Sequence, residues 1–77
     1  MNKEGRKKLS EILAKVEEIE GEICTIKDEE QEKFDNLPEG LQVSDKGTQI
    51  EEIIGYLEEA ENCLQELIAN IDNAMGG

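Results

Sequence analysis

The stretch that decides the fold is residues 50–74, which read IEEIIGYLEEAENCLQELIANIDNA. Its apolar residues recur at alternating steps of three and four, and they are Ile50, Ile53, Leu57, Ala60, Leu64, Leu67, Ile71 and Ala74. Residues 9–26, LSEILAKVEEIEGEICTI, repeat this spacing with Leu9, Ile12, Val16, Ile19, Ile23 and Ile26. A mean step of about 3.5 residues is typical of a helix that packs along another helix in a left-handed coiled coil. The sequence therefore predicts two helices, each with a continuous apolar seam.

The two seams fit each other when the chain folds back on itself. In an antiparallel hairpin the numbers of facing residues add to a constant, and the pairs from Leu9 with Ala74 to Ile26 with Leu57 all add to 83. The turn then falls in residues 35–40, DNLPEG, whose asparagine, proline and glycine favour a turn. A shift by a whole heptad would keep the layers but would leave apolar residues unpaired at one end. We therefore expect an all-α, coiled-coil-like antiparallel two-helix hairpin in the first of these registers.

A chain of 77 residues is expected to form one domain, 1–77. We predict a first helix over about residues 3–34, a connector over 35–47 and a second helix over about 48–75. Two starts of the second helix fit the sequence. Thr48 would open a capping box with Glu51, whereas Ser44 would place an acidic residue in the first turn of an earlier start.

Apolar residues beside the seam predict self-association. If Leu9 and Ile50 are assigned to heptad position a, the seam occupies positions a and d, and positions e and g flank it. A hairpin alone is not expected to cover the apolar residues at e, which are Leu13, Ile54, Ile68 and Met75, or those at g, which are Tyr56 and Cys63. Two hairpins in a four-helix bundle are the simplest closed solution, so we expect a homodimer first and a higher oligomer as the alternative.

The charge is strongly acidic and unevenly distributed. The formal net charge is −12, and no Lys or Arg occurs from Gly47 onward. Such a surface disfavours binding to nucleic acid or to an anionic membrane and favours a partner protein with a basic surface. A carboxylate array of this kind can also imitate the phosphate line of DNA. The candidate contact face on the second helix consists of Glu51, Glu52, Glu58, Glu59 and Glu66.

A basic cluster, Arg6, Lys7 and Lys8, lies at the start of the first helix. Cations at a helix N-terminus oppose the helix dipole, so they do not serve the stability of that helix. In one interpretation they offset the partial negative charge at the C-terminal end of the second helix. In the other, cations from several subunits bind phosphate groups, for example those of a nucleotide.

Nothing in the chain predicts an enzyme, a cofactor or a metal site. There is no His, so neither Cys24 nor Cys63 has an evident base to activate it. The carboxylates of residues 28–32, DEEQE, lack the central glycine of a calcium loop and fan out around a helix, which is typical of a solvated face.

The cysteines and the apolar runs predict a cytosolic protein. Cys24 and Cys63 lie about one turn apart in the predicted register, so we expect reduced thiols and no intrachain disulfide. The N-terminal residues are polar and the apolar runs are short, so we expect neither a signal peptide nor a membrane span.

The connector and its flanks resemble a known group of proteins. Residues 28–42, DEEQEKFDNLPEGLQ, then Ser44, Gly47 and residues 53–60, IIGYLEEA, are similar to short acidic proteins encoded by bacteriophages and other mobile elements of bacteria. The resemblance covers roughly residues 28–62. It implies a phage origin, a helical hairpin, the cytoplasm of a bacterial host and no enzymatic activity. Small phage proteins of this size often bind and inhibit host factors, including defence systems.

These observations predict a small non-enzymatic binding protein. We expect it to self-associate and to bind or inhibit a host protein, such as a defence-system component, through its acidic helical face. One alternative is an oligomeric sponge that sequesters a nucleotide-type ligand through the basic N-terminal cluster. The other is a structural or assembly protein of a phage particle.

Overall fold

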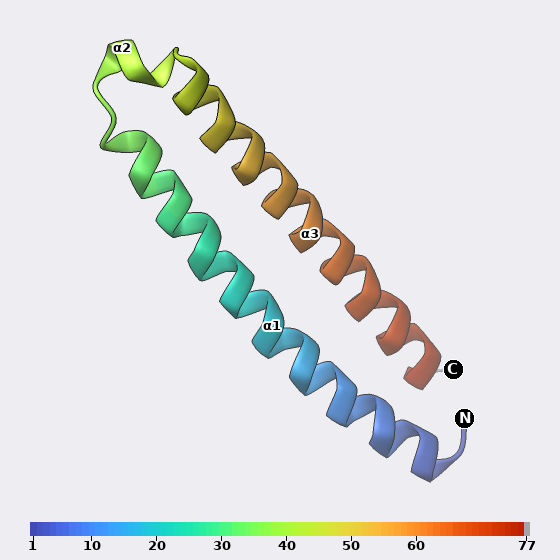
Figure 1. Ribbon diagram of the computed structural model, residues 1–77. Helices are drawn as coiled ribbons and strands as arrows, with labels where there is room; N and C mark the ends of the chain where they lie inside the picture. The colour runs from blue at the N-terminus through green and yellow to red at the C-terminus, as the bar shows by residue number, and fades with distance from the viewer. Residues whose placement is uncertain (77) are drawn as a thin grey trace.

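The computed structural model describes residues 1–76, which form a long helical hairpin (Figure 1). Its helices are α1 (Lys3–Asp35), α2 (Glu39–Gln42) and α3 (Asp45–Gly76). Helices α1 and α3 run antiparallel and side by side, and the Cα trace measures 58 × 15 × 12 Å. The predicted all-α fold is confirmed for these residues, which contain no strand. Gly77, the last residue of the predicted domain, lies outside the described residues.

The ends of the helices follow local capping chemistry. The Asn2 side chain accepts a hydrogen bond of 2.7 Å from the backbone N–H of Gly5, which caps the start of α1. Helix α1 ends at Asp35, one residue beyond the predicted position. Helix α3 begins at Asp45, three residues before position 48, directly after Ser44, the alternative start.

The connector is a tight corner that contains the single turn of α2. The Gln42 side-chain amide donates hydrogen bonds to the backbone carbonyls of Phe34, at 3.2 Å, and of Leu37, at 3.1 Å. It thereby adds a second donor to the Phe34 carbonyl, which already accepts from the backbone N–H of Leu37, and gives a donor to the Leu37 carbonyl. Gly47, in the first turn of α3, is buried against this corner. One side chain of α2 thus ties the corner to the end of α1.

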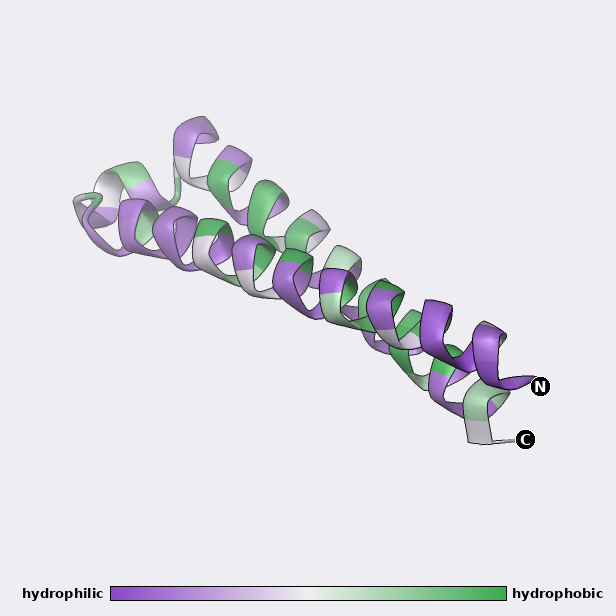
Figure 2. Ribbon diagram, turned by 90° about the horizontal axis from the view of Figure 1, so that it is seen from below, coloured by the Kyte–Doolittle hydropathy of each residue, from purple (hydrophilic) through white to green (hydrophobic). Residues whose placement is uncertain are grey.

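The helices meet through rows a and e, so the predicted seam of rows a and d is wrong. The buried apolar residues of the described chain are Val16, Ile50 and Ile71 at a and Ile54 at e, each 7–9% exposed. The isoleucines at row d of α1 are largely open to solvent, with exposed fractions of 43% for Ile12, 46% for Ile19 and 48% for Ile26. Hydrophobic residues recur along the middle of α1 and along α3, whereas the N-terminal turns of α1 are hydrophilic (Figure 2).

The register also differs from the predicted one. A register that adds to 83 would place Lys27 opposite Tyr56 and Glu20 opposite Cys63. Instead, Lys27 pairs with Glu61 and Glu20 accepts a hydrogen bond from Gln65. These contacts lie five and two residues further along α3 than predicted, which corresponds to about 7.5 Å and about 3 Å along the helix axis.

The geometry of the α-helix explains the difference. Rows a and d and rows a and e have the same three-four spacing, because d lies three residues after a and e lies three residues before the next a. A helix that is apolar at a, d and e has a face wider than one neighbouring helix covers. Four residues predicted to be left for a second copy, Leu13, Ile54, Ile68 and Met75, lie at e and are buried or half-buried within the single chain. That expectation is corrected: the apolar residues left uncovered are those of row d.

Candidate functional site

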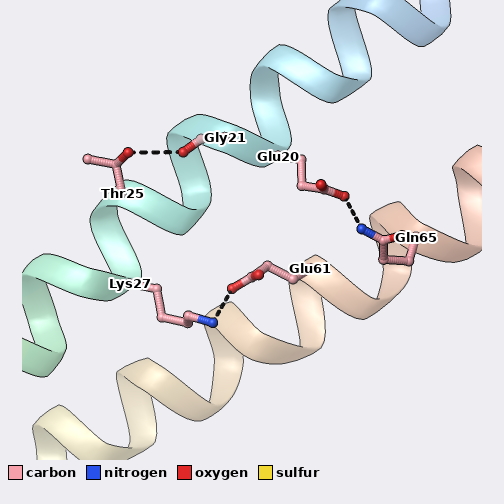
Figure 3. Close-up of polar contacts among 6 residues, drawn as sticks. All are labelled: Glu20, Gly21, Thr25, Lys27, Glu61 and Gln65. Carbon is pink, nitrogen blue, oxygen red and sulfur yellow. Dashed lines mark hydrogen bonds and ion pairs between the residues drawn. The ribbon is translucent and has the colours of Figure 1, made fainter.

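A polar layer crosses the middle of the seam between α1 and α3 (Figure 3). The Lys27 Nζ lies 2.8 Å from Oε1 of Glu61, and the two side chains are 26% and 22% exposed. One layer away, the Gln65 side-chain amide donates a hydrogen bond to the Glu20 carboxylate. Lys27 and Glu20, both in row e, thus have an ion-pair partner and a hydrogen-bond partner across the seam. These polar pairs also help to specify the register of the hairpin, because each polar side chain needs its own partner. Apolar contacts alone specify a register less strictly.

The ion pair changes the titration of its lysine. The hydrogen bond to Glu61 raises the pKa of Lys27 above its ordinary value of 10.5, while burial acts in the opposite direction. The negative charges of Glu61 and Glu58 raise the pKa further. The pair is partly open to water, so its effect on stability is screened.

An alkaline loss of stability follows from this pair. Because the folded-state pKa of Lys27 is raised, the pair stabilises the fold below pH 10.5, and that contribution disappears as the pH rises through the folded-state pKa. The difference in free energy of unfolding between the wild type and Lys27→Met should therefore stay constant from about pH 7 to about pH 9 and shrink towards pH 11. Urea unfolding at these pH values measures it. A difference that grows with alkaline pH would contradict the pairing.

The candidate acidic face is fully displayed on the outer side of α3. Its five residues, Glu51, Glu52, Glu58, Glu59 and Glu66, are all exposed. They occupy row b, which borders the seam beside row e, and row c, which points away from α1. Lys27, in the seam, lies beside Glu58, with which it lines a shallow hollow. Among the described residues, α3 carries no cation after Lys46, so the remainder of this face has no positive charge of its own helix to neutralise it.

The basic cluster is not brought to one point within the chain. Arg6, Lys7 and Lys8 are exposed and follow one another on α1, so they project about 100° apart around the helix. Lys8 pairs with Glu4 at 3.6 Å, and both side chains are mostly exposed. A phosphate site would need further chains to bring these cations together, and this alternative stays a prediction.

The remaining candidates for self-association lie at the surface. Tyr56 is 77% exposed, and Cys63 is also exposed. Both occupy row g, directly beside the uncovered row d. Sequence reasoning placed row d inside the hairpin and so missed its exposed members, Ile12, Ile19, Ile26, Ile53 and Leu67. The signal that could have found them is that rows d and e are both largely apolar in α3, whereas α1 can cover only one of them.

Other chemical sites are not evident in residues 1–76. This part of the chain contains no group of three His, Cys, Asp or Glu side chains that could hold a metal ion. Cys24 and Cys63 are free thiols. None of the described helices is both long enough and apolar enough to cross a membrane.

Comparisons with protein-family models, with curated proteins and with solved structures give no match to this chain.

Proposed function

We propose that this hairpin is a non-enzymatic binding protein whose acidic face engages a basic surface of a partner protein. The observation that supports it best is the row of carboxylates on α3, which is exposed along its length and lacks cations of its own helix. Within α3 these carboxylates gain no favourable i,i+4 ion pair, because the helix carries no cation after Lys46. A basic partner would supply the missing positive charges. In keeping with the resemblance to phage proteins, the proposed partner is a protein of the bacterial host.

The face is suited to steer and orient a partner. Charges of one sign along a helix raise the rate of encounter with an oppositely charged surface and reject surfaces of like charge. Glu51 and Glu58 lie in row b and Glu52, Glu59 and Glu66 in row c, about 100° further around the helix, and successive members of each row are seven residues apart. A regular spacing of two turns, about 10 Å, would favour a partner with cations on a helix or along a strand.

The test is capture of host proteins on the immobilised full chain, followed by measurement of affinity for each captured protein. Neutralising the acidic face with E51Q, E52Q, E58Q, E59Q and E66Q should weaken binding by about 10- to 100-fold, since each charged contact contributes modestly. The affinity of the wild type should also fall when salt is raised from about 50 to about 300 mM, because salt screens exposed charges.

A control variant with the same net charge distinguishes an effect of the acidic face from an effect of the total charge. The variant E11Q, E17Q, E18Q, D28N and E32Q removes five exposed carboxylates from α1, none of which forms an ion pair or hydrogen bond with the described residues of α3. It should bind like the wild type. If both variants bind equally well, or lose affinity equally, the acidic face of α3 is not the contact surface.

A further inference from the structure

An apolar strip runs along one side of the whole hairpin. We call it the d face: Ile12, Ile19, Ile26, Ile53, Ala60, Leu67 and Ala74. In an antiparallel pair that meets through rows a and e, the d rows of both helices fall on the same side of the plane through the two axes. The five larger side chains are each 40–48% exposed. The strip ends near the corner, where row d becomes polar at Lys33 and Lys46. A single chain therefore leaves the d face open to solvent.

The exposed surface is larger than a compact protein of this size would have. The hairpin exposes 5685 Å², and no side chain of the described residues is fully buried. A compact monomer of 8.6 kDa exposes about 4,700 Å², so about 1,000 Å² remains in excess. The broad side of a trace of 58 × 15 Å has a footprint on the order of 800 Å², which is about what each partner contributes to a stable interface.

The charges beside the d face favour a second copy over a charged partner. Row g borders the face on each helix. On α1 it carries Lys8, Lys15, Glu22 and Glu29, which sum to zero, and on α3 it carries Gln49, Tyr56, Cys63 and Asn70, which are uncharged. Every carboxylate of α3 after Lys46, except Glu61 in the seam, lies in rows b and c instead. This border is thus a surface on which two copies of a chain with net charge −12 can meet without direct like-charge repulsion.

We propose that two copies pack d face to d face in an antiparallel four-helix bundle, with α1 of each copy against α3 of the other. A rotation of 180° about an axis parallel to the helices generates the second copy from the first. Each residue then has the same position along that axis, its height, in both copies. The seam contacts Lys27 with Glu61 and Glu20 with Gln65 show which residues share a height, since their numbers add to 88 and 85. Row d pairs that add to 86 lie within this interval.

The resulting pairs are complementary in size. Ile19 lies against Leu67 of the second copy, Ile12 against its Ala74 and Ile26 against its Ala60. Alternation of a large and a small side chain allows two layers to approach closely. At the corner end, Ile53 meets the aliphatic stem of the second copy's Lys33, whose charged head reaches solvent. The acidic face points away from the interface and stays free, so this inference does not rest on the proposed function.

The first test is the mass of the full chain by sedimentation equilibrium. The wild type should weigh twice 8.6 kDa at micromolar concentration, and salt should tighten the dimer because it screens the two acidic copies. Ile19→Asp should raise the dissociation constant at least 100-fold. The control Val43→Asp makes the same change at an apolar residue 86% exposed outside the d face and should leave it unchanged. A wild type that stays monomeric at millimolar concentration, or equal effects of both variants, would overturn the proposal.

The second test leaves the d face intact, so it does not depend on how Ile19→Asp folds. In the proposed arrangement Cys63 faces Glu22 of the second copy. In the other face-to-face arrangement, with α3 on α3, it lies beside row g of the second copy's α3, opposite Asn70 when Leu67 of each copy packs on Leu67 of the other. In a Cys24→Ser background a short bis-maleimide should join copies of the Glu22→Cys variant into covalent dimers and should leave the Asn70→Cys variant monomeric on a denaturing gel. The reverse pattern overturns the pairing of α1 with α3, and no cross-link in either variant overturns the shared d face.

Discussion

Gly47→Ala is expected to destabilise the hairpin by about 3 kcal/mol, although alanine is the better helix former. A Cβ atom at this position would lie 2.0 Å from the carbonyl oxygen of Gln42, 2.5 Å from its carbonyl carbon and 2.8 Å from its Cα. All three are backbone atoms, which cannot rotate away as a side chain can. The described glycines have no positive φ, so space and not backbone angle requires a glycine here.

The cost extends beyond the local clash. To admit a methyl group, α3 must move away from the corner, and Gln42 would then lose its hydrogen bonds to Phe34 and Leu37. The Leu37 carbonyl would then lose this partner, whereas the Phe34 carbonyl would keep the backbone N–H of Leu37. The intrinsic gain of alanine over glycine in a helix, about 1 kcal/mol, is smaller than this loss.

Gly55 offers the matched control for this prediction. It lies in the same helix, is exposed, and has no atom within 4 Å of the position that a Cβ would take. Gly55→Ala should therefore raise the free energy of unfolding by up to about 1 kcal/mol. Urea unfolding of both variants, at equal protein concentration, measures the contrast. A Gly47→Ala protein as stable as the wild type would show that the corner is looser than these distances indicate.

Much of the fold follows from the sequence. The three-four spacing gives two long helices, and Asn36, Pro38 and Gly40 give the break between them, because both effects are local to a few residues. The acidic face could also be predicted, since all its members lie outside the apolar rows on any helix. Local patterns of this kind do not depend on how the helices are turned towards each other.

The choice of seam could not be predicted from spacing alone. Row e of α1 contains Glu20 and Lys27, and polar residues at a seam are costly unless they find partners. Their partners, Gln65 and Glu61, lie more than thirty residues away in the sequence, and only the arrangement in space reveals the match. The need for glycine at position 47 is equally non-local, because it depends on how closely the corner approaches α3.

Neighbouring isoleucines at positions 53 and 54 test which row closes the hairpin. Ile54, at row e, is 9% exposed, whereas Ile53, at row d, is 40% exposed. Both substitutions to alanine remove the same atoms from adjacent helical positions, so helix propensity cancels in the comparison. Ile54→Ala should cost about 2–4 kcal/mol, because it opens a cavity between α1 and α3.

The concentration dependence separates the two roles further. The cavity at Ile54 lies within one chain, so its cost should be the same at every protein concentration. Ile53→Ala should cost about 1 kcal/mol or less at the lowest concentration, where single hairpins prevail, and more as the concentration rises and the d face of the wild type becomes covered. Thermal unfolding over a hundredfold range of concentration measures both slopes. A larger and concentration-independent loss at position 53 would mean that rows a and d close the hairpin after all, and that row e is the side left open.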